Sequence, residues 1–442
     1  MLNRVFAIAA ALALLALAPA GSHPDAQIVS MLSTVSAQRL LADDQRLVAF
    51  GTRNDFSETT STQTHGVFAA RDWLVRSFTR IAKTTDGRMT VRTDNYLQPK
   101  THRTPRAVHE SSVIAQLNGD EPGRSYVISS HYDDCNGDCT DGMDVAPGAD
   151  DNASGTSAVL EAARVMATTH FRGTIYFVCF DGEELGLWGS AHLAAELKAQ
   201  HAPILADLNN DIIGNTHGGG GASEPNVIRV FSNALAPTAK PSQVNLLGFE
   251  NDSPSRELSR YAAETIPLYL PNFHVRQIFR ADRFLRGGDQ ESFQDQGFAA
   301  IRFVEPHENF FHQHQNVRIS NGIQFGDLPQ YIDASYLKRA TQANIATLAS
   351  LALGPAPPAK VQIVLAHLGY TTTLRWAKAD DATSYEIVWR RTTSPVWEHV
   401  QSVTGATQAV VNASYDDFIF AVRSVSANEL RSPAVYPVPS RS

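Results

Sequence analysis

Two adjacent carboxylates, Glu183 and Glu184, follow the apolar run TIYFVCF in the segment FDGEELGLWGS. Like charges side by side repel each other unless positive charge lies beside them. The apolar residues on both flanks argue against a fully solvated acidic turn. If one carboxylate binds a cation, the other can take a proton from a water molecule that the cation activates. The doublet therefore indicates metal-dependent hydrolysis.

Four further segments place acids or imidazoles where a predicted strand ends or a helix begins. They are SSHYD with His131 and Asp133, PGADDNASG with Asp150 and Asp151, NNDIIG with Asp211, and NFFHQHQN with His312 and His314. Each alone has an ordinary interpretation, such as a loop histidine or an acid at a helix N-terminus. Together they supply two imidazoles and three carboxylates, a set suited to a pair of divalent ions that share one carboxylate. The set is His131, Asp151, Glu184, Asp211 and His312, and its mixed nitrogen and oxygen ligands favour zinc.

The elements that must position these side chains alternate between strand and helix. Beyond Asp151, apolar strands at 173–180 and 204–211 alternate with helical patterns at 154–167 and 187–200. Continuously apolar strands of this kind predict an α/β fold, with a mostly parallel mixed sheet sandwiched by helices. Ligands of such sheets bind at the carboxyl ends of the strands, where these acids lie.

The length of 442 residues suits two or three domains. We assign residues 27–353 to the α/β domain. The segment GPAPPA, residues 354–359, is predicted to be a proline-rich linker. Residues 360–442 contain short strands at regular spacing, which predicts a small all-β sandwich. Its runs LRW, YEIVW and FAVRSV resemble a fibronectin type III domain.

Residues 1–20 have the pattern of a signal peptide. Arg4 precedes a short apolar run, and Ala18-Pro-Ala20 offers a cleavage site after Ala20. An uncleaved anchor helix is the alternative, but the apolar run is short and a polar segment follows. We therefore expect a secreted or periplasmic protein without a membrane span in the mature chain. The net charge of -8 and the lack of a long basic run argue against nucleic-acid binding.

The three cysteines fit an exported protein. Cys135 and Cys139 lie close together in HYDDCNGDCTDG, which makes a local disulfide plausible in an oxidising compartment. Metal binding is the alternative, but one close pair supplies only half of a zinc site. Cys179, inside an apolar strand, is expected to be a buried small hydrophobic residue.

The ordered series SHYD, PGADDNASG, DGEELGLWGS, NNDIIG and FFHQHQN resembles the M28 family of zinc peptidases, and most of all its secreted bacterial aminopeptidases. This resemblance implies a zinc-peptidase fold over residues 27–353 and two catalytic zinc ions. By position in the motifs, the implied ligands are His131 and Asp211 for one ion and Glu184 and His312 for the other, with Asp151 bridging both. Glu183 would be the general base and Asp133 would orient His131. Asp289, in GGDQES, resembles a residue near the substrate pocket.

One motif departs from the family pattern. The family follows its last histidine with Thr-Pro-x-Asp, whereas Gln313 to Asn316 stand here. His314 is thus a rival ligand, although His312 has the expected spacing after the aromatic pair. The predicted activity is hydrolysis at the free N-terminus of a peptide. A carboxypeptidase, a glutaminyl cyclase with one zinc, or a non-catalytic binding or adhesion protein are the alternatives. The C-terminal domain would contact a surface, polymer or large substrate, or act as a spacer.

Overall fold

The computed structural model describes residues 23–441 except 122, 236–239, 241–251, 285 and 367–368. The predicted signal peptide, residues 1–20, lies outside the described residues. Within the described ranges, no helix has both the length and the apolar character needed to cross a membrane.

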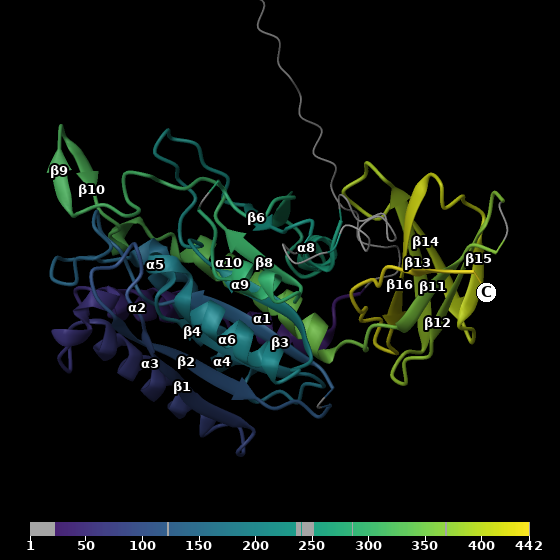
Figure 1. The fold of residues 1–442 in the computed structure, drawn as a ribbon, viewed down its shortest axis with the longest axis horizontal. Helices are drawn as coiled ribbons and strands as arrows, with labels where there is room; N and C mark the ends of the chain where they lie inside the picture. Colours follow the sequence, from purple (N-terminus) through teal and green to yellow (C-terminus); the bar gives the residue numbers. More distant parts are fainter. Residues whose placement is uncertain are drawn as a thin grey trace, which may run out of the picture.

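An eight-stranded mixed sheet forms the centre of the larger part of the molecule (Figure 1). Its strands follow the order β1-β2-β4-β3-β5-β8-β6-β7. Their bounds are β1 (Met89–Gln98), β2 (Val108–Leu117), β3 (Ser125–His131), β4 (Thr174–Phe180), β5 (Ile204–Asn210), β6 (Val227–Phe231), β7 (His274–Ile278) and β8 (Ala300–Val304). The central strands β4, β3, β5 and β8 run parallel to one another. β1 and β2 join them in antiparallel pairs, as β6 does on the other side.

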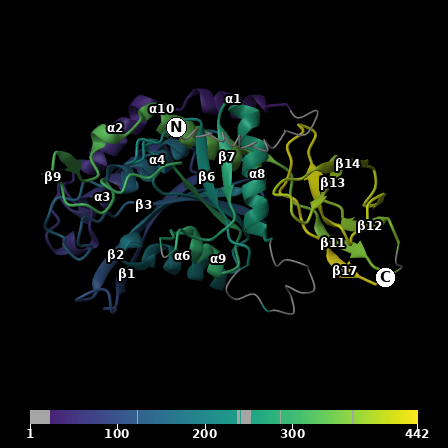
Figure 2. The ribbon, with the colours of Figure 1, turned by 90° about the horizontal axis from the view of Figure 1, so that it is seen from above.

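Helices cover both faces of this sheet (Figure 2). One face packs against α3 (Val67–Ala82), α4 (Gly155–Met166), α8 (Pro254–Tyr269) and α10 (Ala334–Leu353), and α1 (Ala26–Ser33) and α2 (Ala37–Val48) pack in turn on α4 and α10. The other face packs against α6 (Trp188–Ala199) and α9 (Gln290–Asp295). Every residue of β3 is buried, as its position between two helical layers requires. The predicted α/β fold is confirmed.

The register of the central strands places their carboxyl ends side by side. His131, the last residue of β3, pairs with Phe180 at the end of β4. Ser129 of β3 pairs with Asn209 of β5, so Asp211 emerges next to His131. Residues far apart in the sequence thus meet at one edge of the sheet.

A smaller β unit follows α10. One sheet contains β15 (Gln408–Val411), β12 (Thr372–Ala377), β11 (Ala359–Val364) and β17 (Val438–Ser440). The other contains β14 (His399–Thr404), β13 (Ser384–Arg391) and β16 (Phe418–Val425). Apolar side chains of both sheets, such as Leu374, Trp376 and Ile387, share one core, which makes the unit a sandwich. Its likeness to fibronectin type III stays a prediction.

Candidate active site

Side chains from five segments meet at the carboxyl edge of the central strands. They are His131 at the end of β3, Asp151 in the turn η2 (Ala149–Ser154) before α4, Glu184 in the short helix α5 (Glu183–Gly186) after β4, Asp211 after β5, and His314 in the segment between β8 and β9 (Arg318–Ser320). Four of them belong to the predicted ligand set. The fifth, His314, was the alternative to His312.

Asp151 lies between two groups of donor atoms. Its Oδ1 is 3.3 Å from His131 Nε2, and its Oδ2 is 3.1 Å from His314 Nε2. On the first side, Asp211 Oδ1 is 3.7 Å from His131 Nε2. On the second side, Glu184 Oε2 is 2.9 Å from His314 Nε2. A carboxylate with one oxygen toward each group has the arrangement of a ligand that bridges two metal ions.

The donor atoms fit zinc. The ligand atoms of His131, Asp151 and Asp211 lie within 4.8 Å of one another. His131 Nε2, Asp211 Oδ1 and Glu184 Oε1 are buried without a hydrogen bond. Buried polar atoms without partners are costly, and bound cations would satisfy all three. Imidazole nitrogens and carboxylate oxygens are ordinary zinc ligands.

The electrostatic field of the cluster favours positive charge. Glu184 raises the pKa of His314 well above its usual value, although burial opposes this shift. Burial also opposes protonation of His131, but Glu183 and Asp133 raise its pKa. A site that stabilises protons on two imidazoles stabilises metal cations for the same reason.

Asp133 holds two members of the cluster in place. Its Oδ1 lies 3.3 Å from His131 Nδ1, which leaves Nε2 turned toward Asp151. Its Oδ2 accepts a hydrogen bond from the Glu184 backbone N at 3.0 Å. The side chain therefore lies where the predicted orienting role requires it.

Two further positioning residues were not identified from the sequence. Asp327 accepts a hydrogen bond from the Asp151 backbone N at 2.7 Å. The Arg302 guanidinium contacts Asp211 Oδ2 at 2.6 Å, which leaves Oδ1 turned toward His131. The sequence does offer a signal for Arg302, because a charged residue within the apolar strand AIRFV needs a buried partner of opposite charge. The sequence offers no such signal for Asp327, because its partner Asp151 lies far away in the chain.

The structure does not place His312 in the cluster. Its ring stacks on Tyr331, with ring centroids 3.8 Å apart and an interplanar angle of 12°. The backbone turns here, since His312 N and Gln313 N both donate to Asn309 O, and His314 has a φ of 50°. This turn points the two histidines in different directions, and His314 occupies the place expected for His312.

Asp289 does not line the cavity. It is fully buried at the N-terminus of α9, and burial raises its pKa to about 7. Its predicted position near the substrate pocket stays a prediction, and its charge acts on Glu183 from behind the cavity wall.

A cavity of about 540 Å³ opens over the cluster. Its lining includes Glu183, Glu184 and His314. Glu183 is half-buried, and burial together with the nearby charges of Asp211 and Glu184 raises its pKa. Of the acid doublet, Glu184 faces His314, whereas Glu183 is accessible from the cavity.

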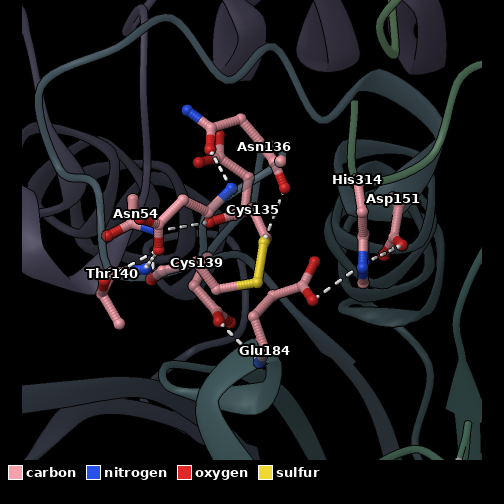
Figure 3. The surroundings of a disulfide bond; sticks show 12 residues. Asn54, Cys135, Asn136, Cys139, Thr140, Asp151, Glu184 and His314 are labelled. Atoms are coloured by element: carbon pink, nitrogen blue, oxygen red, sulfur yellow. Dashed lines mark hydrogen bonds and ion pairs between the residues drawn. A yellow bond between two sulfur atoms is a disulfide. The ribbon is translucent and has the colours of Figure 1, made fainter. Parts of the chain in front are cut away.

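A disulfide between Cys135 and Cys139 borders the cluster (Figure 3). Its sulfur atoms lie within 4.8 Å of the ligand atoms of Glu184 and His314. Because both sulfurs are oxidised, they offer no thiolate to a metal. The bond instead closes the short turn of residues 135–139 beside Glu184. Cys179 is buried in β4, as expected.

Comparison with known proteins agrees with this geometry. Residues 112–324, which include all the clustered side chains, match the model of peptidase family M28. A "Probable zinc metalloprotease" of Leptosphaeria maculans is 41% identical over 423 residues, which cover 94% of this chain and 98% of that protein. The chain belongs to peptidase family M28. A second relative, a "Probable zinc metalloprotease" of Pyrenophora teres f. teres, is 40% identical over 425 residues, which cover 94% of this chain and 88% of that protein.

Solved structures share the fold of this M28 zinc metalloprotease. Legionella pneumophila LapB matches with a TM-score of 0.56 and 20% identity, covering 77% of this chain and 79% of LapB. Macrostomum lignano glutaminyl cyclase matches with a TM-score of 0.54 and 16% identity, covering 75% of this chain and 95% of the cyclase. The family model and the curated relatives carry the family assignment, whereas the likeness to the solved structures is one of fold alone.

Proposed function

We propose that this M28 protein is a secreted two-zinc aminopeptidase, which hydrolyses the N-terminal peptide bond of peptides or proteins. The observation that carries the proposal is the position of Asp151, with one oxygen toward each group of donors. His131 and Asp211 would hold one ion, and Glu184 and His314 the other. Bound zinc would polarise the scissile carbonyl and lower the pKa of water to about 7.

Glu183 is proposed as the general base. It lines the cavity beside Glu184, and it is not among the side chains in contact with His314 or Asp151. Its carboxylate would accept a proton from the attacking water and deliver it to the leaving amine. Asp133 would keep His131 and the Glu184 backbone fixed during this transfer.

A free substrate amine fits the charge of this site. Asp151, Glu183 and Glu184 all line the cavity, and their carboxylates attract an ammonium group. The fold alone does not separate an aminopeptidase from a cyclase, since both kinds of protein share it. The choice therefore rests on the two-ion geometry, because the cyclase alternative needs one ion only.

Replacing Glu183 tests the assigned base. Glu183→Gln should keep the zinc content of the wild type and lower kcat by about 10²- to 10⁴-fold, because proton transfer is lost. Glu196→Gln, on α6 beside Arg92, is the matched control and should keep full activity. Full activity of Glu183→Gln would remove this residue from the mechanism.

A substrate panel tests the kind of reaction. Aminoacyl-nitroanilides with a free amine should be cleaved, their N-acetylated forms should not, and chelation should abolish cleavage. A peptide with N-terminal glutamine reports cyclisation in the same assay. Cleavage of the acetylated forms would contradict the aminopeptidase proposal, and a cyclised product would favour the cyclase.

A further inference from the structure

The cavity over the candidate site has arginines in its wall as well as acids. Arg103, Arg283, Arg286 and Arg302 all line it. Two of them are engaged within the protein. Arg302 contacts Asp211 Oδ2 at 2.6 Å, and Arg283 forms an ion pair with Glu308 and donates its Nε to Arg286 O at 2.9 Å.

Arg286 keeps donors available for a ligand. Its Nη2 donates to Gln313 Oε1 at 2.8 Å and lies 3.2 Å from Glu308 Oε2. These contacts use one of its two terminal nitrogens, and 37% of the side chain is exposed. The guanidinium lies 5.0 Å from the centroid of the Phe310 ring, which limits its freedom to move.

Positive charge exceeds negative charge around Glu308. Three guanidinium groups, those of Arg229, Arg283 and Arg286, contact this single carboxylate. Although burial opposes the shift, Arg283 and Arg229 lower the pKa of Glu308 to about 2. Glu308 is therefore ionised at neutral pH, and its single negative charge faces three positive charges. Burial raises the pKa of Glu291, another lining residue, to about 7, so Glu291 is only partly ionised at neutral pH.

Arg103 approaches the same cavity from the loop between β1 and β2. It is exposed, and its Nη2 donates to the Glu184 backbone O at 3.3 Å. Among the described residues, no carboxylate forms an ion pair with it. Its guanidinium therefore lies next to the candidate ligand Glu184 without a direct ion pair.

We propose that Arg286 and Arg103 bind a carboxylate of the substrate, and that the enzyme prefers peptides carrying one near the scissile bond. This inference rests on the proposed peptidase function. A guanidinium binds carboxylates through paired charge-assisted hydrogen bonds, which favour an acid over its amide. The cavity volume of about 540 Å³ lies within the range of ligand pockets. The carboxylate comes from an N-terminal acidic side chain or from the C-terminus of a short peptide.

Matched substrates distinguish these two sources. The first arm compares aspartyl- with asparaginyl-nitroanilide, and the second compares Leu-Gly-Gly with its C-terminal amide. We expect kcat/KM to favour the acid by about tenfold or more in one arm, since a hydrogen bond to a charged group is worth that much. The ratio should fall toward 1 in Arg286→Gln and in the double variant with Arg103→Gln. Arg286→Lys should keep part of the ratio, and Arg375→Gln, in the β unit, should keep all of it.

Calorimetry on the zinc-loaded protein measures the same preference without turnover. Aspartic acid α-amide should bind about tenfold more tightly than asparagine amide, and Arg286→Gln should remove the difference. For the second arm, N-acetyl-leucine is compared with its amide. If no substrate is hydrolysed but this preference is present, the carboxylate site stands and the peptidase proposal fails. Equal rates and equal affinities for acid and amide in both arms would overturn the carboxylate site and leave the peptidase proposal intact.

Discussion

Two histidines separated by one residue have very different surroundings in this protein. His314 Nε2 contacts two carboxylates, whereas the His312 ring lies flat against Tyr331. Burial lowers the pKa of His312, and the charge of Glu184 raises that of His314. Only His314 therefore has the electrostatic environment of a metal ligand.

Substituting each histidine tests this difference. His314→Ala should lose one zinc ion per chain and lower kcat/KM by more than about 100-fold, because a direct ligand matters more than the neighbours that orient it. His312→Ala is the matched control, and it should retain both ions. Elemental analysis and kinetics on nitroanilides measure the two effects. Loss of zinc in His312→Ala alone would reverse the assignment.

Three elements bring a second group of acids together behind the site. Asp55 in η1 (Asp55–Thr59), Glu110 in β2 and Asp181 after β4 are all buried, and their ligand atoms lie within 4.8 Å of one another. Burial raises the pKa of each, that of Asp181 to about 7. The folded protein thus binds protons here that the unfolded chain releases near pH 4.

The stability of the protein should reflect these protons. Because the folded-state pKa values are raised, the stabilisation is complete below about pH 4 and is lost as pH rises through the folded values, with a slope near 1.4 kcal/mol per pH unit for each extra proton bound. Asp55→Asn removes one such group and should flatten the slope between pH 5 and 7. Urea unfolding of both proteins over this range measures it. An unchanged slope would mean that something other than protons neutralises the cluster.

The sequence predicts elements better than the contacts between them. The strands β3, β4 and β5 were expected from uninterrupted apolar runs, because a strand covered on both faces has a local signature. Most candidate ligands could be named from the sequence because they come directly after a predicted strand. The role of Asp327 depends on a contact across 176 residues. The position of His314 in the cluster, where His312 was expected, depends on a backbone turn. Periodic sequence patterns do not indicate such a turn.

The whole molecule joins its two parts through polar contacts on α8. Glu257 of this helix accepts hydrogen bonds from Trp397 Nε1 at 3.0 Å and from Ala434 N at 2.9 Å. Arg423 of β16 contacts Glu264 of α8 at 2.6 Å and Glu386 of β13 at 2.7 Å. Because these groups are largely buried, the β unit covers part of α8 and is held against it.

Removing the arginine at this junction should destabilise the protein. Arg423→Gln leaves Glu264 without its partner at a largely buried position, and breaking such a pair costs roughly 3 kcal/mol. Arg375→Gln, in the same β unit with its side chain near the surface, should cost little. Thermal unfolding of zinc-loaded protein compares the two. Equal stability of Arg423→Gln and the wild type would show that the junction contributes little.

We propose that ligands scattered along the chain converge on two zinc ions. Anomalous diffraction at the zinc absorption edge, from crystals of the zinc-loaded protein, tests it most directly. We predict two peaks roughly 3.5–4 Å apart, one beside His131 and Asp211, the other beside Glu184 and His314, with Asp151 between them. A single peak, or peaks away from Asp151, would contradict the binding of two zinc ions at this site.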